Sequence, residues 1–305
     1  MQLSPDDRCA RDGCEQVVNT TPSPLVQRRR LRTELRRARI GADLTQEQVA
    51  KAMDWHPSKI IRIETGAVGI STNDLRALLG LYKIHDSERT DELIELARAS
   101  RQSSWSSKYR GRISSQFLQY IEYEEAASVL RTYEPLVVPG LLQTEEYADT
   151  IIRKHADAGT PADLIQTRME IRLTRQHLLE QPSPPTSIFV LDQAAVQRLV
   201  GERNIARGQL DRLINLATRP NITIEVVPFS AGLHRGMLEA FLILEFSEPE
   251  DSDVLFVETS RDLIVSHDEA GEISGYLEVF NQLRSISLGY DRTLAYLTDL
   301  IKQIP

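Results

Sequence analysis

Two short helical patterns separated by a tight break constrain the fold of this chain more than any other feature. Thr45 is suited to cap a helix over residues 46–53, and Pro57 is suited to the first turn of a second helix that stops at Gly66. Helices of this length are unstable alone in water, because their stability comes mainly from packing. We therefore expect the two helices to share a small core.

The apolar spacing of this pair separates a core from an outer face. The expected core positions are Val49, Ala50, Met53, Ile60 and Ile63. Ser58, Lys59 and Arg62 are then left on the outer face of the second helix, where Ser58 and Arg62 are four residues apart and point the same way. The pattern predicts a helix with one buried face and one face of hydrogen-bonding side chains.

The outer face has the chemistry to read double-stranded DNA. A helix fits the major groove, which is about 12 Å wide. Arg62 can donate two hydrogen bonds to guanine, Ser58 can serve several bases, and Lys59 can reach a base or a phosphate. Gln46 begins the preceding helix, where its amide and the free backbone N–H groups can hold a phosphate.

The charge of the chain is unevenly distributed. The formal net charge of −8 argues against a nucleic-acid partner when it is taken over the whole chain. Residues 25–84, however, contain 12 Lys and Arg against 6 Asp and Glu, and residues 85–305 carry −12. A basic unit is thus joined to an acidic one, and the acidic one is suited to meet a basic surface on its own chain or on a partner.

Periodicity divides the chain into four parts. We expect a flexible arm over residues 1–24, a helix-turn-helix unit over 25–84, a connecting helix and linker over 85–104, and a mixed α/β domain over 105–305. In the last part, helices are expected at 114–132, 144–154, 162–180, 193–200, 205–218, 270–285 and 292–303, and strands at 187–191, 222–227, 241–246, 254–258 and 263–266. Short links between the later strands predict a partly antiparallel sheet.

The large domain offers little chemistry. It contains no nucleophile elbow, zinc-binding HExxH, P-loop or dinucleotide fingerprint, so we expect no enzyme activity, cofactor or metal. His234 is interpreted as a turn residue or a ligand contact, and Asp192 as a helix cap or a catalytic acid. The tyrosines at the start of this domain, namely Tyr120, Tyr123, Tyr133 and Tyr147, are core residues or pocket residues.

Other features of the sequence argue against a disulfide-rich fold, a zinc site and a membrane span. Cys9 and Cys14 are too few for a disulfide framework, and no histidine nearby completes a zinc site. No run of eighteen apolar residues is present, so we expect no membrane span and a cytoplasmic location.

The segment 44–66 resembles the XRE class of helix-turn-helix regulators, which are related to phage repressors. Gln46, Ala50, Ile60 and Glu64 fall at the signature positions of that class. The resemblance implies a five-helix, lambda-repressor-like domain in which Arg39 pairs with Glu64. It also implies DNA contacts from Gln46, Pro57, Ser58 and Arg62, with Lys59 beside them. Because one short helix covers only a few base pairs, we expect the protein to bind DNA as a homodimer at the nucleoid.

Two positions depart from that class. Asp54 stands where a turn glycine is usual, so a non-glycine residue must adopt a left-handed backbone conformation. The loop 67–70 lacks the basic residues often used for phosphate contact. The cluster Arg28, Arg29, Arg30 and Arg32 in the first helix is a possible replacement.

The rest of the chain, through motifs at 120–144, 190–192 and 220–232, resembles the C-terminal domain of actinobacterial XRE regulators, including the antitoxin-like and WhiJ types. The resemblance implies that this domain receives a signal from a small BldB-like partner protein or from a ligand. The alternative is an antitoxin-like protein that mainly binds the partner and uses DNA binding for autoregulation.

Overall fold

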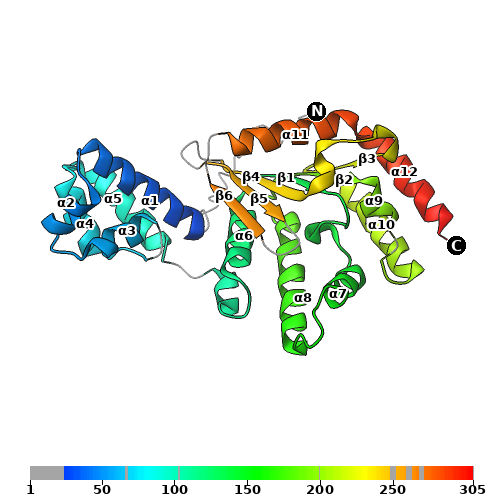
Figure 1. Cartoon of the computed structure of the whole chain (residues 1–305), viewed down its shortest axis with the longest axis horizontal. Helices are drawn as coiled ribbons and strands as arrows, with labels where there is room; N and C mark the ends of the chain where they lie inside the picture. The colour runs from blue at the N-terminus through cyan, green and yellow to red at the C-terminus, as the bar shows by residue number, and fades with distance from the viewer. Residues whose placement is uncertain are drawn as a thin grey trace, which may run out of the picture.

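The computed structural model describes residues 24–65, 68–101, 104–198, 200–247, 252–258, 263–267 and 271–304. The arm expected over residues 1–24 lies outside these residues apart from Pro24, where the first helix begins. The described residues form a unit of five helices followed by a domain with a mixed sheet (Figure 1). The expected fold class is confirmed.

The five helices of the first unit each contribute to one core. They are α1 (Pro24–Gly41), α2 (Gln46–Ala52), α3 (Pro57–Glu64), α4 (Thr72–Leu81) and α5 (Ser87–Ala99). Fully buried side chains from the five are Leu35, Val49, Ile60, Leu75 and Leu93. Four of the helices begin with a side chain that accepts a backbone N–H, from Thr45, His56, Ser71 and Asp86. These caps stabilise the start of each helix, because they accept backbone N–H groups that the helix itself leaves unpaired.

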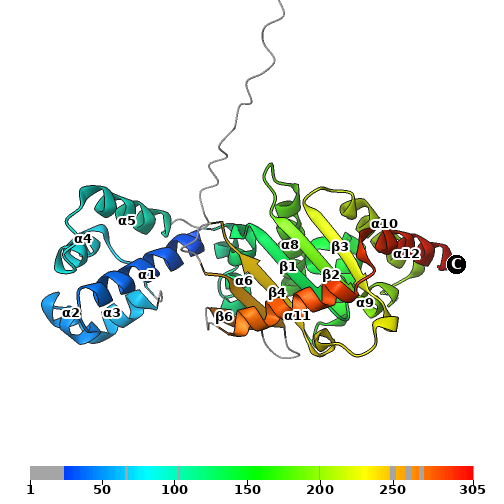
Figure 2. The ribbon, with the colours of Figure 1, turned by 90° about the horizontal axis from the view of Figure 1, so that it is seen from above.

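Helix α1 belongs to two packing units. Leu31 and Leu35 lie in the core of the helical unit, whereas Val26 is buried in the core of the second domain. Arg28 Nη2 donates to the Ser100 carbonyl at 3.0 Å, which joins the start of α1 to the end of α5. Figure 2 shows α1 running from the helical unit to the edge of the second domain.

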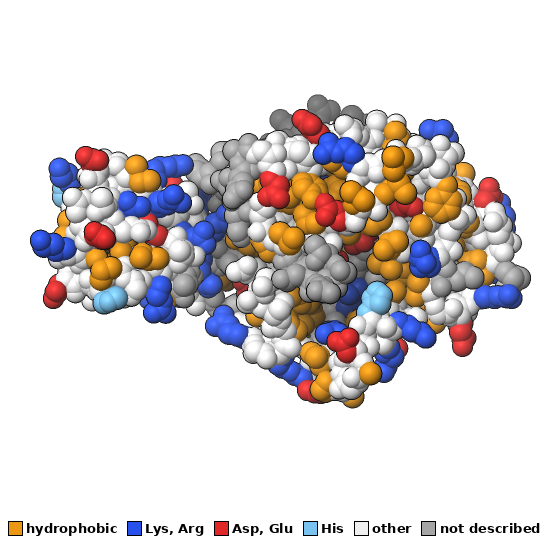
Figure 3. All heavy atoms as spheres, in the orientation of Figure 1, with side chains coloured by type: hydrophobic (Ala, Val, Ile, Leu, Met, Phe, Trp, Pro, Cys, Tyr) orange, Lys and Arg blue, Asp and Glu red, His pale blue; other side chains and the backbone are white. Residues whose placement is uncertain are grey.

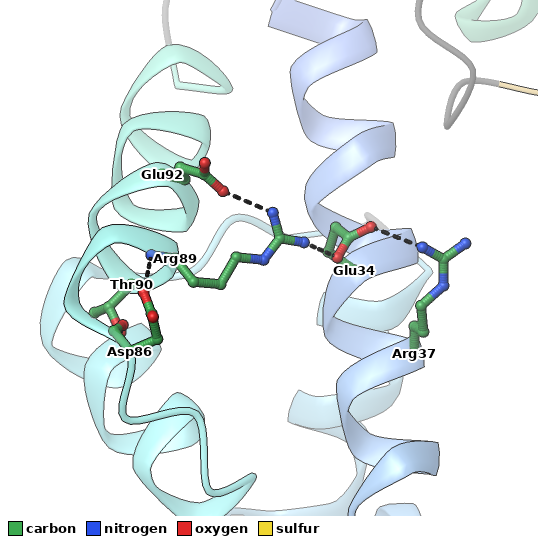
Figure 4. Close-up of polar contacts among 6 residues, drawn as sticks. All are labelled: Glu34, Arg37, Asp86, Arg89, Thr90 and Glu92. Atoms are coloured by element: carbon green, nitrogen blue, oxygen red, sulfur yellow. Dashed lines mark hydrogen bonds and ion pairs between the residues drawn. The ribbon is translucent and has the colours of Figure 1, made fainter.

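The carboxylate of Glu34 ties α1 to α5 (Figure 4). Arg37 Nη1 lies 3.2 Å from Glu34 Oε1, and Arg89 pairs with the other oxygen of the same carboxylate. Arg89 also donates to Glu92 at 2.7 Å on its own helix. Helix α5 therefore packs on α1 as part of the helical unit.

The second domain is built on a six-stranded sheet. Its strands are β1 (Val129–Glu134), β2 (Thr186–Asp192), β3 (Ile222–Val227), β4 (Ala240–Glu245), β5 (Val254–Glu258) and β6 (Leu263–His267), in the order β3-β2-β1-β4-β5-β6. Strands β1, β2 and β3 are parallel, and β4, β5 and β6 add in antiparallel fashion. The expected partly antiparallel sheet is confirmed.

The helices of this domain cover both faces of the sheet. They are α6 (Ser115–Ala126), α7 (Glu145–Lys154), α8 (Ala162–Gln176), α9 (Gln193–Gln197), α10 (Arg203–Ala217), α11 (Glu272–Ile286) and α12 (Gly289–Gln303). Leu130 and Phe189 face a core shared with α6, α7, α10 and α12, while Tyr133 and Val190 face α11. Successive strand residues alternate between the two cores, as the pleat requires.

One expected helix is wrong at its end. Residues 114–132 were predicted as helical, but α6 ends at Ala126 and residues 129–132 belong to β1. Strand β1 is central and pairs with β2 on one side and β4 on the other. The backbone of this apolar, β-branched segment gains partners on both edges as a strand, and this tertiary pairing outweighs its local helical pattern.

A buried ion pair holds α8 against α6. Arg175 Nε donates to Glu124 Oε2 at 2.7 Å, and Arg175 Nη2 donates to the Tyr120 hydroxyl at 3.0 Å. The Arg175 and Glu124 side chains are almost fully buried. Such a pair fixes the relative register of two helices, because breaking either half leaves a buried charge without a partner.

Glu134, at the end of β1, makes the stability of this domain sensitive to pH. Burial raises the pKa of Glu134 to about 8 from an ordinary 4.5, the charge of Glu258 adds to the rise, and Arg172 opposes it. The neutral form is therefore favoured in the folded protein. Its stabilising effect is complete below the ordinary pKa and is lost as the pH rises through the folded value.

We expect Glu134→Gln to flatten the fall in the free energy of unfolding between about pH 5 and about pH 8, because the amide does not ionise. Urea denaturation across that range measures the slope. Glu145→Gln, at an exposed position of α7, is the matched control and should keep the slope of the unmodified protein. Equal slopes in the Glu134 variant and the control would contradict the assignment.

Candidate nucleic-acid interface

The turn between α2 and α3 brings the two helices together. Trp55 N donates to the Ala50 carbonyl at 2.8 Å, and Asp54 adopts a left-handed conformation with φ of 54°. The sequence predicted this conformation from the missing glycine. Asp tolerates it better than most residues, because its short side chain can bond locally. The turn places Ala50 and Ile60 in the same buried core.

Helix α3 begins at a histidine cap. Ser58 N donates to His56 Nδ1 at 3.2 Å, and Ser58 Oγ lies 2.7 Å from the same nitrogen. Pro57 occupies the first turn, where its missing N–H costs nothing. The cap was not predicted, because histidine is not among the usual capping residues.

The exposed side of α3 carries three of the predicted DNA-binding residues. Ile60 and Ile63 are buried, while Pro57, Ser58 and Arg62 are exposed. The structure therefore brings these three side chains to one surface of the helical unit. Figure 3 shows that Lys and Arg side chains outnumber Asp and Glu over the visible face of this unit.

Lys59 is held differently from its neighbours. Its Nζ lies 3.0 Å from Asp74 Oδ2 on α4 and 3.9 Å from the centre of the Trp55 ring. Both contacts direct the ammonium group along the surface of the unit. Lys59 must leave Asp74 to reach a base, so a role at a phosphate beside α3 fits this position better.

Ile61 is an exposed residue that the sequence interpretation missed. Its side chain is 44% exposed on α3 beside Arg62. An apolar side chain in the major groove can contact the methyl group of thymine. The sequence interpretation assigned Ile60 and Ile63 to the core and gave Ile61 no role, because an isoleucine between them does not stand out from the apolar pattern.

A polar network beneath the surface joins three helices. Arg39 Nε donates to Glu64 Oε1 at 2.7 Å, and Arg39 Nη2 donates to Glu64 Oε2 at 3.1 Å. Gln46 Nε2 donates to the same Oε2 at 2.7 Å. The hydrogen bond to Glu64 raises the pKa of Arg39 above its ordinary value. The predicted pair thus links α1 to α3, and Gln46 adds the start of α2.

A hollow of about 610 Å³ opens next to this network. Its walls include Arg36, Arg39, Thr45, Gln46 and Thr65. Among the described residues, Glu64 accepts one amide N–H of Gln46, which leaves the second N–H for another acceptor. The position beside the start of α2 suits a DNA backbone that passes the helical unit.

The arginine cluster on α1 divides in its orientation. Arg28 donates to the Ser100 carbonyl, and Arg29 Nη2 donates to the Asp253 carbonyl of the second domain at 3.4 Å. Arg32 Nη1 donates to the Thr65 carbonyl at the end of α3, at 3.1 Å. Arg28 and Arg29 thus reach the end of α5 and the second domain, whereas Arg32 reaches the end of α3.

Most candidate residues of the large domain serve as a helix cap or as part of the core. Asp192 Oδ1 accepts Ala194 N at 2.8 Å and caps α9. His234 Nε2 lies 3.4 Å from Asp192 Oδ2. Tyr133 and Tyr147 are buried core residues, as is Tyr123. Among the residues that the structure describes, no group of His, Cys, Asp and Glu is arranged to hold a metal.

Comparison with known families matches two parts of the chain. Residues 30–93 match a family described as a helix-turn-helix domain. Residues 117–299 match a family described as a domain of unknown function, DUF5753. The chain belongs to the DUF5753 family. No curated protein and no solved structure matches it.

The first match places the N-terminal unit of this DUF5753 protein among helix-turn-helix domains, as in XRE-like DNA-binding regulators. It covers most of α1 and all of α2, α3 and α4. Within the described part of this DUF5753 protein, no helix is both long and apolar enough to span a membrane.

We expect Glu64→Ala to lower the free energy of unfolding of this DUF5753 protein by about 3 kcal/mol, because Arg39 and Gln46 lose their acceptor at a buried position. Urea denaturation measures the loss. Glu95→Ala, which removes an exposed pair with Arg98 on α5, is the control and should cost less than about 1 kcal/mol. Similar losses in the two variants would show that the network does not hold the helices together.

Proposed function

We propose that this protein is a sequence-specific transcriptional regulator that inserts α3 into the major groove. One observation carries the proposal. Ser58 and Arg62 lie four residues apart on the exposed side of a helix whose other side is buried. A helix held in this way presents hydrogen-bonding side chains to base edges with little freedom to move.

Each exposed residue has a role that suits its chemistry. Arg62 pairs with guanine through two hydrogen bonds, and Ser58 contacts the neighbouring base. Ile61 packs on a thymine methyl group. Gln46 and Lys59 bind phosphates on either side of the groove and set the register of the helix.

The proposed assembly on DNA is a homodimer, because one short helix reads only a few base pairs. Two half-sites then lie about 34 Å apart, one turn of the double helix. The protein acts in the cytoplasm at the nucleoid and needs neither a cofactor nor a catalytic residue for this task.

We expect Arg62→Ala to weaken operator binding by about 1–3 kcal/mol and to relax the preference at one base position. The operator is first selected from a pool of random duplexes, and fluorescence anisotropy then compares operator with random DNA. Arg98→Ala, an exposed arginine on α5, controls for the lost charge. If the Arg62 variant keeps the wild-type ratio of operator to random affinity, α3 is not the recognition helix.

We propose that the DUF5753 domain receives the regulatory signal from a small BldB-like partner protein or a ligand. The segment from Phe229 to Leu238 supports a protein partner, because Leu233 and Leu238 are 92% and 90% exposed. Phe229 and Met237 are exposed in the same segment. Exposed apolar side chains gathered in one segment are typical of an interaction surface.

The same surface favours a second candidate function. An antitoxin-like protein would use the segment mainly to bind and neutralise its partner, with DNA binding kept for autoregulation. The two functions differ in what the partner does to DNA affinity: a signal changes the affinity for operator, whereas neutralisation has its main effect on the partner.

We expect Leu233→Ser with Leu238→Ser to reduce affinity for a small BldB-like protein by about tenfold or more, because apolar area is lost from the contact. Isothermal titration calorimetry measures the change. Ile264→Ser, at an exposed position on β6, is the control and should bind as the unmodified protein does. Equal affinities in all three proteins would exclude this segment as the docking surface.

A further inference from the structure

We propose that the junction between α1 and the second domain is a phosphate-binding site. A hollow of about 420 Å³ lies there, well above the roughly 30 Å³ that one water molecule occupies in the liquid. Four arginines of α1 line it, Arg29, Arg32, Arg36 and Arg37, and Ser252 contributes from the segment before β5. Nothing in the proposed reading of DNA by α3 requires these residues.

The arginines converge because of their spacing on the helix. Arg29, Arg32 and Arg36 are three and four residues apart, so their side chains leave the same side of α1. Among the described residues, no carboxylate lines the hollow. Like charges brought together in this way repel each other unless an anion lies between them.

Arg29 is fixed in place before any ligand arrives. The residue is 8% exposed, its Nη2 donates to the Asp253 carbonyl at 3.4 Å, and its guanidinium lies 5.8 Å from the centre of the Tyr123 ring. Its Nη1 is buried and has no hydrogen-bond partner among the described residues. A buried N–H group without an acceptor is costly, and because Arg29 lines the hollow, an anion bound there would lie close to this guanidinium group.

Arg32 repeats the same feature one turn further along α1. Its Nη1 donates to the Thr65 carbonyl, while its Nε is buried and finds no partner in the part of the chain that the structure describes. Burial lowers the pKa of Arg32 below its ordinary value, and the charge of Arg29 adds to this. An anion between the two guanidinium groups would offset this electrostatic cost.

The other two arginines set the charge of the site. Arg37 is paired with Glu34, as Figure 4 shows. Arg36 is exposed and has no ion-pair partner among the described residues. Among the described residues that line it, the hollow therefore has about three positive charges without an ion-pair partner, which suits a phosphate better than a carboxylate because a phosphate carries more charge and more acceptor oxygens.

Two sources of phosphate fit the position. Arg36 and Ile40 also line the hollow beside Gln46, so the two hollows are neighbours along α1. A DNA backbone that passes the start of α2 is one source of phosphate for the domain junction, and a free phosphorylated molecule that occupies the junction alone is the other. In either case the anion bridges the domains, because its arginines lie on α1 while Ser252 belongs to the sheet domain.

The first experiment uses the full chain without DNA. Inorganic pyrophosphate is added at constant ionic strength, with chloride as the reference, and thermal unfolding is followed. We expect the unfolding midpoint to rise by about 4 °C or more in the unmodified protein, because a ligand that binds only the folded state stabilises it. The single variant Arg36→Gln should lose part of this rise in the unfolding midpoint. The double variant, Arg32→Gln with Arg36→Gln, should lose more of it.

The second experiment measures the affinity for random duplex DNA against salt concentration. If the DNA backbone is the source, Arg36→Gln lowers the slope of log affinity against log salt by about one. If a free phosphorylated molecule is the source, the slope is unchanged while the pyrophosphate effect remains. Arg98→Gln with Arg153→Gln removes two exposed arginines elsewhere and should behave as the unmodified protein in both assays.

The site is excluded if pyrophosphate does not shift the midpoint of thermal unfolding and if the Arg36 variant and the control variant have the same salt slope for DNA binding. Arg36 is exposed, so loss of folding cannot explain a negative result for its single variant. Failure here is also separable from failure of the proposed DNA recognition. Arg36→Gln acts equally on all duplexes, whereas Arg62→Ala acts on the operator alone.

Discussion

The structure depends on a single helix that is packed into two cores at once. Helix α1 buries Val26 in the sheet domain and Leu35 in the helical unit, and its 18 residues are continuous between them. A continuous helix is stiff over this length, so the two cores cannot reorient independently without breaking one set of contacts. Each apolar anchor contributes about 1.5–3 kcal/mol by burial, which makes both ends costly to release.

This shared helix also connects the two functions proposed for the protein. Arg39 near its end holds Glu64 of α3, and Arg29 near its start touches Tyr123 and the Asp253 carbonyl of the other domain. A partner that changed the packing around Tyr123 would therefore act on the same rigid element that supports the recognition helix. The phosphate hollow lies between these two points, where an anion can favour one arrangement of the domains over another.

Local chemistry explains what the sequence could predict. The boundaries of α2 and α3 follow from Thr45, Pro57 and the strained Asp54 turn, which act within a few residues and keep their meaning in any tertiary context. Strand β1 could not be predicted in the same way. Its identity comes from pairing with β2 and β4, whose registers start at Thr186 and Glu245, far along the chain. Likewise, the helical period places Ser58 and Arg62 outward, but it does not show that Lys59 is held by Asp74.

The net charge of the protein does not describe the charge that a ligand meets at the junction of the two domains. The sheet domain's part of the sequence, which is strongly acidic, would repel a DNA backbone if its charges acted over the whole molecule. Salt screens charges beyond about 8 Å at physiological ionic strength, so a phosphate near the junction is governed by the side chains closest to it. Those side chains include the arginines of α1, two of which have buried N–H groups with no acceptor among the described residues. The described side chains that line the hollow are therefore positive although the chain is negative, and they favour an anion that the net charge alone would repel.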